Sequence, residues 1–456
     1  MGKYFGTDGI RGVAGEALDA ELAFKVGKAA ATVLMQAAEQ EKPSDDGYRP
    51  KVVIGRDTRI SCDMLESALC AGLCSAGVDV TLLGVLPTPA VAFITTFTES
   101  DMGIVISASH NTFEHNGIKM FGSSGAKMSD DFEEYMEFLI DDDSKVIKKT
   151  GGEIGRISHD CAECKTEYLK FLASTSIGKY KRKIAIDCAN GAASETARYL
   201  FRLLNAEFEI ICNEPDGVNI NVECGSTHLD YIKSMMKTGR FGVGVALDGD
   251  ADRCLIIDEN GETVDGDMIL AVMARYMSDT GKLKENAFVG TIVSNAGMDI
   301  FARENGFSFH RSDVGDRHVL ELMCKLGCNL GGESSGHVIF SDYMPCGDGQ
   351  LTAILFLNVL IESGKTVSEL VRDIPRLPQV MPSFTLTGGA EQRDYILSHP
   401  ALKEEVKKQE AILNGFGRIN IRPSGTEPII RVLVEAKTEA LSSEIADNII
   451  SFMGTL

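Results

Sequence analysis

The chain has 456 residues, of which 44% are hydrophobic, so it can bury several cores and is not expected to be disordered. Its formal net charge of -21, from 45 basic and 66 acidic residues, argues against nucleic acid or an anionic membrane as the main partner. The chain starts without a signal-peptide pattern, has no apolar run of membrane-spanning length and scatters its 12 Cys residues, so we expect a cytoplasmic protein with free thiols.

Strand–helix–strand units recur three times along the chain. They begin at KVVIGRDTR (51–59), KIAIDCANG (183–191) and AFVGTIVSNAG (287–297), and each returns to a second strand after a helical stretch. Such alternation predicts parallel or mixed sheets covered by helices, so we expect three related α/β domains. A smaller α+β piece follows, with strands near SFTLTG and RINIRP and one helix near DYILSHPALKEEVKKQEAIL.

Domain boundaries are expected at three weak points. The stretch 141–155 is charged and then glycine-rich, 258–267 has the Asn-Gly turn of a hairpin followed by a helix from Met268, and 372–384 carries three Pro residues. The predicted domains are 1–150, 151–256, 257–371 and 372–456.

The most specific chemical signal is the segment VGVALDGDADRCLIID (243–258). Asp248, Asp250 and Asp252 alternate with small residues, and residues two apart in an extended segment point the same way. Three converging carboxylates repel one another unless a hard divalent cation binds between them, and Mg²⁺ would complete its shell with phosphate oxygens or water. An EF-hand is excluded because Arg253 stands where that loop needs Gly and because the flanking segments are strand-like.

A serine stands where the apolar strand of GIVISASHN (103–111) ends. An ordinary turn is the plain interpretation, since Ser and Asn are common loop residues. A phosphoryl group carried by Ser109 would instead supply the oxygen that three aspartates leave missing around a metal, and the metal would offset charge during phosphoryl transfer. Lys119 and Arg11 could neutralise the same group.

The segment NLGGESSGHVIFSDY (329–343) places polar residues two apart between glycines. Glu333, Ser335 and His337 would present an acceptor, a hydroxyl and an imidazole on one face. Hydroxyl-rich ligands such as sugars need this mixture, although a glycine-rich loop without a ligand has the same composition.

The segment INIRPSGTEPIIRVLVEA (419–436) has a strand that ends in small and polar residues, and a second strand that carries another arginine. Backbone amides, hydroxyls and two guanidinium groups there could bind a phosphate, whereas a plain turn with surface arginines is the alternative. The residues of this candidate phosphate loop are Arg422, Ser424, Gly425, Thr426 and Arg431.

The motifs FGTDGIRG, ISASHN with NGIK, DGDADR, GESSGH and RPSGTEP occur in the order expected of the α-D-phosphohexomutase superfamily, which the sequence resembles from residue 5 to residue 431. The resemblance implies a four-domain, heart-shaped α/β enzyme with three related domains and a smaller C-terminal domain around a central cleft. The resemblance also implies that Ser109 is a phosphoserine and that it binds Mg²⁺ together with Asp248, Asp250 and Asp252. It implies sugar contacts by Glu333, Ser335 and His337, and a phosphate loop formed by Arg422, Ser424, Gly425, Thr426 and Arg431. It further implies a cleft loop at Gly315, Asp316 and Arg317, and an Arg253 that orients a ligand.

Within the superfamily, segments such as FGTDGIRGVAGE, DGVNINVECGSTHLD and VGDRHVLE are similar to the bacterial branch that interconverts glucosamine 6-phosphate and glucosamine 1-phosphate, on the route to UDP-N-acetylglucosamine and the cell wall. Action on mannose or glucose phosphates is one alternative, and a non-catalytic sugar-phosphate sensor is another. Thr112 stands where the family often has Pro. Ser334 stands where this branch usually has Gln and the phosphomannomutase/phosphoglucomutase branch has Met, so it does not assign the sugar.

The reaction implied by the resemblance starts from phospho-Ser109, which phosphorylates one end of the sugar. The bisphosphate then turns end for end and returns the other phosphate to the serine. Lys119 and His110 are candidates for taking the proton of the attacking hydroxyl, and for His110 a packing and hydrogen-bonding role is favoured. A homodimer is implied by the resemblance alone.

Overall fold

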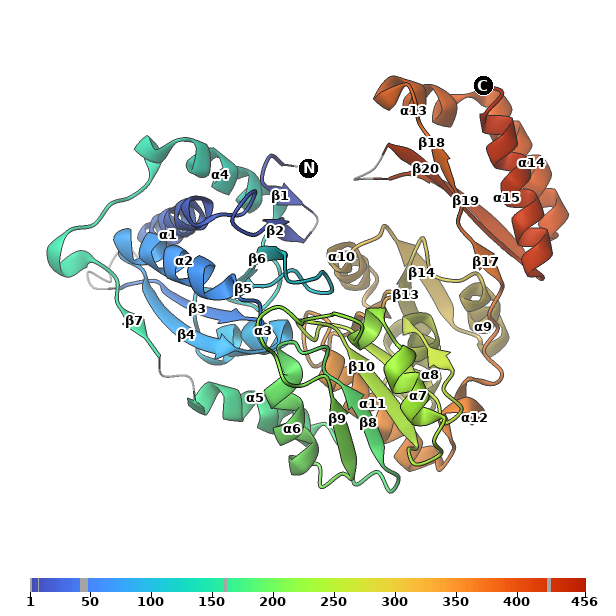
Figure 1. The fold of residues 1–456 in the computed structure, drawn as a ribbon, viewed down its shortest axis with the longest axis horizontal. Helices are drawn as coiled ribbons and strands as arrows, with labels where there is room; N and C mark the ends of the chain where they lie inside the picture. The colour runs from blue at the N-terminus through green and yellow to red at the C-terminus, as the bar shows by residue number, and fades with distance from the viewer. Residues whose placement is uncertain (1, 7, 42–47, 160–161, 425–427) are drawn as a thin grey trace. The chain divides into compact units, whose positions relative to one another are not determined.

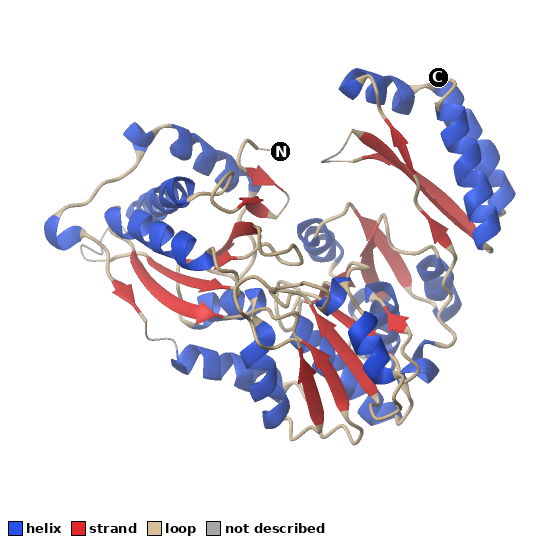
Figure 2. Ribbon diagram, viewed as in Figure 1, coloured by secondary structure: helices blue, strands red, loops and turns tan. Residues whose placement is uncertain are grey.

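The computed structural model describes residues 2–6, 8–41, 48–159, 162–424 and 428–456 (Figure 1). The chain divides into two compact units. The larger one contains the residues up to Ile292 together with His310–Arg372, and the smaller one contains Val293–Phe309 and Asp373–Leu456. Figure 2 shows helices lying against the strands throughout, which confirms the α/β class predicted from the strand–helix alternation.

The first sheet of the larger unit has the strand order β1-β2-β6-β5-β3-β4-β7. Its centre is parallel, because β3 pairs in parallel with both β4 and β5, and the Val and Ile residues of β3 and β5 are buried, as strands covered on both faces require. The elements are β1 (Phe5–Gly6), β2 (Gly9–Val13), α1 (Ala20–Glu41), β3 (Lys51–Arg56), α2 (Cys62–Ser75), β4 (Asp79–Val85), α3 (Thr88–Phe97), β5 (Met102–Ile106), β6 (His115–Gly122), α4 (Asp130–Asp141) and β7 (Ile157–Ser158).

The second sheet has the order β12-β11-β10-β8-β9, with β9, β8 and β10 parallel. The predicted Asn-Gly hairpin is confirmed, because β11 and β12 are antiparallel on either side of Asn260 and Gly261. The elements are α5 (Ala162–Ser174), β8 (Ile184–Asp187), α6 (Ala193–Leu203), β9 (Phe208–Ile211), α7 (Asp230–Met236), β10 (Val243–Leu247), β11 (Cys254–Ile257) and β12 (Thr263–Val264).

The third sheet has the order β14-β13-β15-β16. The helix expected from Met268 begins two residues earlier, because Asp265 caps it by accepting a hydrogen bond from the Met268 N–H at 3.1 Å. The elements are α8 (Gly266–Asp279), β13 (Ala287–Thr291), β14 (Ser308–Ser312), α10 (Asp316–Leu326), β15 (Leu330–Gly332), β16 (Val338–Phe340), α11 (Gly349–Ser363) and α12 (Val367–Val371).

The smaller unit contains a sheet in which β20 pairs antiparallel with β17, β18 and β19, around its own apolar core. The single helix expected before β19 is two helices, because Pro400 favours an extended residue before it and starts a helix of its own. The elements are α9 (Gly297–Asn305), β17 (Gln379–Val380), β18 (Ser383–Thr385), α13 (Gly389–Ser398), α14 (Pro400–Leu413), β19 (Gly417–Pro423), β20 (Ile429–Ala436) and α15 (Glu439–Met453).

Among the described residues, no helix combines the length and the apolar character needed to cross a membrane.

Candidate active site

The loop between β5 and β6, residues 107–114, brings Ser109 to the aspartate cluster, and we call it the serine loop. Ser109 is buried and adopts a φ of 52°, in the left-handed region. Its Oγ donates a hydrogen bond to Oδ2 of Asp248 at 2.8 Å, although the two residues are 139 positions apart in the chain. The structure therefore joins the serine and the first aspartate of two separate sequence motifs.

The three aspartates converge as predicted, but for a different reason. Residues 248–253 form a turn rather than an extended segment, with the Ala251 N–H donating to the Asp248 carbonyl at 3.1 Å and a left-handed Ala251 at φ 57°. The compact turn, and not alternation along a strand, brings carboxylate oxygens of Asp248, Asp250 and Asp252 within 4.8 Å of one another.

The aspartate cluster fits a divalent cation. All three side chains are buried, and Oδ1 of Asp250 and Oδ1 of Asp252 accept no hydrogen bond from any described residue. Burial, and then the charges of Asp252 and Asp250, raise the pKa of Asp248 well above its ordinary value. A bound cation would remove both the repulsion and the unmet acceptor capacity.

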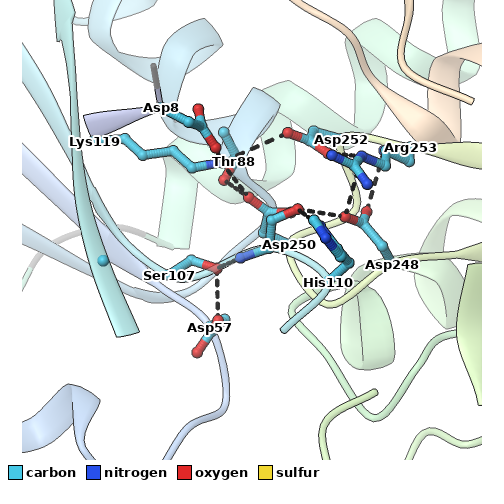
Figure 3. Close-up of polar contacts among 12 residues, drawn as sticks. Asp8, Asp57, Thr88, Ser107, His110, Lys119, Asp248, Asp250, Asp252 and Arg253 are labelled. Atoms are coloured by element: carbon cyan, nitrogen blue, oxygen red, sulfur yellow. Dashed lines mark hydrogen bonds and ion pairs between the residues drawn. The ribbon is translucent and has the colours of Figure 1, made fainter. Parts of the chain in front are cut away.

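Lys119 of β6 supplies a buried positive charge beside the cluster, as Figure 3 shows. Its Nζ lies 2.9 Å from Oδ2 of Asp250 and 3.2 Å from Oδ2 of Asp8. Burial alone would lower the pKa of Lys119, but Asp250, Asp8 and Asp252 outweigh it and raise the pKa. Arg11 reaches this network indirectly, through an ion pair with Asp8.

His110 and Arg253 flank the serine and the aspartates. The Nδ1 atom of His110 lies 3.4 Å from Oγ of Ser109. Burial, followed by the charges of Arg253 and Arg11, lowers the pKa of His110 to about 4. The Nε atom of Arg253 lies 3.9 Å from Oδ2 of Asp248 and from Oδ1 of Asp252, so its guanidinium group borders the cluster (Figure 3).

The predicted sugar loop is the turn between β15 and β16, in which the Glu333 N–H donates to the His337 carbonyl at 2.9 Å. Two of its candidates lie close together, because Glu333 contacts Gly315 and His337 contacts the neighbouring Asp316. The Nδ1 atom of His337 faces Oδ2 of Asp252 at 3.6 Å, and Oε1 of Glu333 accepts from the Gly315 N–H at 3.0 Å. The buried Ser335 hydroxyl has no hydrogen-bond partner among the described residues.

The further loop at residues 315–317 begins α10. Asp316 pairs with Lys127 at 2.8 Å, and Nε2 of His337 lies 3.7 Å from Oδ2 of Asp316. Arg317 points elsewhere: it pairs with Asp130 and, at 3.2 Å, with Glu321, and it lines a cavity of about 560 Å³. The structure therefore connects Asp316, rather than Arg317, to the aspartate cluster through His337.

The predicted phosphate loop belongs to the smaller unit. Arg422 on β19 and Arg431 on β20 are directly opposite in the antiparallel register, and burial followed by the Arg431 charge lowers the pKa of Arg422. The Ser424 N–H donates to the Ile429 carbonyl at 3.0 Å. Gly425 and Thr426 lie outside the described residues. Two adjacent cations are the arrangement that a phosphate would neutralise.

Several residues around the serine loop were missed in the sequence. Thr88 donates from Oγ1 to Oδ2 of Asp250 at 2.8 Å, and Asp57, Arg59 and Asn221 contact the serine loop. The signal for Asp57 and Arg59 was present, because RDTR follows the central strand β3, and parallel sheets place functional side chains beyond the carboxyl ends of strands. Asn221 lies in the quoted segment DGVNINVECGSTHLD, but nothing in that segment indicates a contact with the serine loop.

A second group of metal-ligand type lies at the ends of β8 and β9. Donor atoms of Asp187, Cys212 and Cys224 are within 4.8 Å of one another. The Asp187 carboxylate already accepts the N–H groups of Ala189 at 2.9 Å and Gly225 at 3.0 Å, so this group has a structural role in the loops.

The chain matches the phosphoglucomutase/phosphomannomutase family in four successive domains. The α/β/α domains I, II and III match residues 2–146, 166–261 and 265–377, and the C-terminal domain matches residues 387–451. The matched domains follow one another in chain order and together span most of the sequence.

Relatives that match over nearly their full length are 45–46% identical to this chain. The phosphoglucosamine mutase of Caldicellulosiruptor saccharolyticus is 46% identical over 99% of both chains, and that of Shouchella clausii is 45% identical over 99% of this chain and 98% of its own. Among solved structures, a phosphoglucomutase/phosphomannomutase family protein from Burkholderia thailandensis has a TM-score of 0.79 at 24% identity, covering 100% of this chain and 98% of its own. The N-acetylphosphoglucosamine mutase of Aspergillus fumigatus, solved with GlcNAc-6P and magnesium, has a TM-score of 0.67 at 18% identity, covering 94% of this chain and 96% of its own. These last two likenesses concern the fold.

Proposed function

The chain belongs to the phosphoglucomutase/phosphomannomutase family, and on this premise we propose that it interconverts glucosamine 6-phosphate and glucosamine 1-phosphate. The relatives named phosphoglucosamine mutase, at 44–46% identity over nearly the whole chain, support the sugar. The observation that carries the chemistry is the buried Ser109 hydroxyl, 2.8 Å from an aspartate that shares its pocket with two more.

The proposed reaction uses Ser109 as a phosphoryl carrier. The bond between phosphorus and Oγ of phospho-Ser109 breaks while a bond forms to the free hydroxyl oxygen of the sugar monophosphate. The hydroxyl proton passes to a neighbouring base, for which Lys119 and His110 are the candidates. The bisphosphorylated sugar then turns round, and the phosphate at its other end returns to Oγ. Since the reaction moves one phosphoryl group each way, the enzyme is an isomerase that needs no net phosphate donor.

Asp248, Asp250 and Asp252 are proposed to hold Mg²⁺ together with an oxygen on phospho-Ser109. When bound, this ion supplies positive charge that offsets the charge developing on the transferred group. Lys119 and Arg253 stand at 2.9 Å and 3.9 Å from the aspartates and add fixed positive charge at the same place. His110, hydrogen-bonded to Oγ of Ser109, is proposed to orient that hydroxyl.

The other predicted residues are proposed to bind the substrate. Glu333, Ser335 and His337 would contact sugar hydroxyls, and the Ser335 hydroxyl, which finds no hydrogen-bond partner in the described part of the chain, supports this role. Arg422 and Arg431 would bind the phosphate that is not reacting, with Ser424, Gly425 and Thr426. The four domain boundaries, a cytoplasmic location, a homodimer and a substrate contact by Arg317 stay predictions.

The test combines mass and turnover. Intact-mass measurement is expected to find one phosphoryl group on the purified protein and none on Ser109→Ala, while Ser123→Ala, which removes an exposed hydroxyl outside the serine loop, keeps the modification. Glucosamine 6-phosphate should be turned over faster than mannose or glucose phosphates. Full mutase activity in Ser109→Ala would refute the mechanism, and faster turnover of mannose 6-phosphate would refute the sugar.

A further inference from the structure

The serine loop turns its backbone carbonyls toward two side chains from other parts of the chain. Arg59, three residues after β3, donates to the carbonyls of Ser109 at 3.0 Å and Asn111 at 2.8 Å, and also to those of Thr112 and His115. Asn221, from the connection between β9 and α7, donates through Nδ2 to the same two carbonyls, at 2.9 and 2.8 Å. Arg59 from the first sheet and Asn221 from the second therefore hydrogen-bond to the same two carbonyls of the serine loop.

Ser109 needs such external support. Its φ of 52° is unfavourable for a residue with a Cβ atom, and this conformation persists only where surrounding contacts hold it. The loop supplies one contact of its own, from the Ser109 N–H to Oγ of Ser107 at 3.0 Å. The two groups that bind the Ser109 carbonyl set the direction of the peptide that follows, and hence the direction in which Oγ points.

Asn221 is itself fixed in place. It is buried, and its N–H donates to the Ala189 carbonyl at 2.9 Å. Its amide orientation follows from its neighbours, because two carbonyl oxygens require the NH₂ group, while Oδ1 has no partner among the described residues. The turn at residues 248–253 crowds the same point, since a Cβ at Gly249 would lie 2.6 Å from the Ser109 carbonyl oxygen and 2.7 Å from Nδ2 of Asn221.

We propose that Asn221 is a positioning residue for phosphoryl transfer: it clamps the carbonyls of Ser109 and Asn111 so that Oγ of Ser109 stays on the aspartate cluster. The inference rests on the proposed function, because it takes Ser109 as the phosphoryl carrier. Asn221 touches the backbone of the serine loop and not the reacting oxygen. Arg59 is a poorer probe of the same role, because its removal would leave the fully buried Asp57 without its ion-pair partner.

Asn221→Gly tests the proposal most cleanly. Asn221 has a φ of 59°, which Gly adopts without strain, so the variant removes the side-chain amide without straining the backbone. Displacing reacting groups by about 1 Å costs on the order of 100-fold in rate, so we expect kcat to fall by about 10- to 100-fold with KM changed by less than about 3-fold. Asn221→Asp, which keeps the shape but replaces the donor by an acceptor, should lose at least as much.

Asn358→Ala is the matched control. Asn358 is also buried and also bridges two segments, through hydrogen bonds to the Thr175 carbonyl at 2.8 Å and from the Ile177 N–H at 3.0 Å, away from the serine loop. Hydrogen exchange over residues 107–116 should accelerate in Asn221→Gly and not in Asn358→Ala.

The outcomes separate the two proposals. An inactive wild-type enzyme would refute the proposed function, while the exchange measurement would still test the clamp. Wild-type kcat in Asn221→Gly, or equal losses of kcat in Asn221→Gly and Asn358→Ala, would overturn the positioning role.

Discussion

Gly249 is the point at which the turn at residues 248–253 meets the serine loop, and replacing it by Ala should disturb catalysis more than folding. A Cβ there would lie 2.6 Å from the Ser109 carbonyl oxygen, whereas ordinary van der Waals contact starts at 3.4 Å, so one of the two loops has to move by about 0.8 Å. Overpacking of this kind costs about 1–3 kcal/mol of stability. A misplacement approaching 1 Å at the reacting groups costs on the order of 100-fold in rate.

The assay is steady-state turnover of glucosamine 6-phosphate, with thermal unfolding measured on the same preparations. Gly249→Ala is expected to lower kcat by about 30- to 100-fold and to shift the melting temperature by only a few degrees. Gly152→Ala is the matched control, since a Cβ there meets no atom within 4 Å, and it should leave both quantities unchanged. If Gly249→Ala retained the wild-type kcat, the contact between the two loops would not control the geometry of Ser109.

Three other predictions concern the metal, the phosphate and the dependence on pH. Dialysis against a chelator should abolish turnover, and Mg²⁺ should restore it, while intact mass shows the phosphoryl group still present on Ser109; full activity after chelation would contradict the metal role. Arg431→Lys keeps the charge but loses the fork of two donors, so KM for the sugar phosphate should rise about 10-fold with a smaller change in kcat, as steady-state kinetics would show. Burial raises the pKa of Asp348 to about 6, against about 3.9 in an unfolded chain. Between these two pH values the folded state binds a proton that the unfolded state has lost, so the contribution of this protonation to folding stability is lost as the pH rises from about 4 to about 6. Asp348→Asn keeps the cap on the N–H groups of Gln350 and Leu351, so its melting temperature relative to wild type should rise over that interval, and a constant difference would contradict the assigned pKa.

Much of the fold could be predicted because short local sequence patterns specify its strands, helices and turns. Continuous apolar strands such as Lys51–Arg56 and Met102–Ile106 are what a parallel sheet covered by helices requires, and the Asn260-Gly261 turn identified its hairpin directly. The errors were local as well. Pro400 splits a predicted helix, and Asp265 starts one two residues early, because a single capping or helix-breaking residue outweighs the periodicity around it.

The candidate site was predictable where its residues lie in one short segment, and less so where they meet across the fold. The convergence of Asp248, Asp250 and Asp252 was expected, yet a compact turn with a left-handed Ala251 produces it rather than an extended strand. In the sugar loop, the contact between His337 and Asp252 joins two segments far apart in the chain, and the spacing within the loop did not predict it.

Short sequence segments specify the chemical groups available: a serine at the end of a strand, a carboxylate cluster, and arginines around a small-residue loop. Each is recognisable because short segments carry their own backbone preferences. Which of these groups come into contact depends on the folding of the whole chain. Asn221 lies 112 residues from Ser109, and Lys119 lies 131 residues from Asp250, so no local pattern records either contact. Both contacts depend on how the first and second sheets and their loops pack against each other, and that packing is set by the whole buried interface rather than by the residues that meet there.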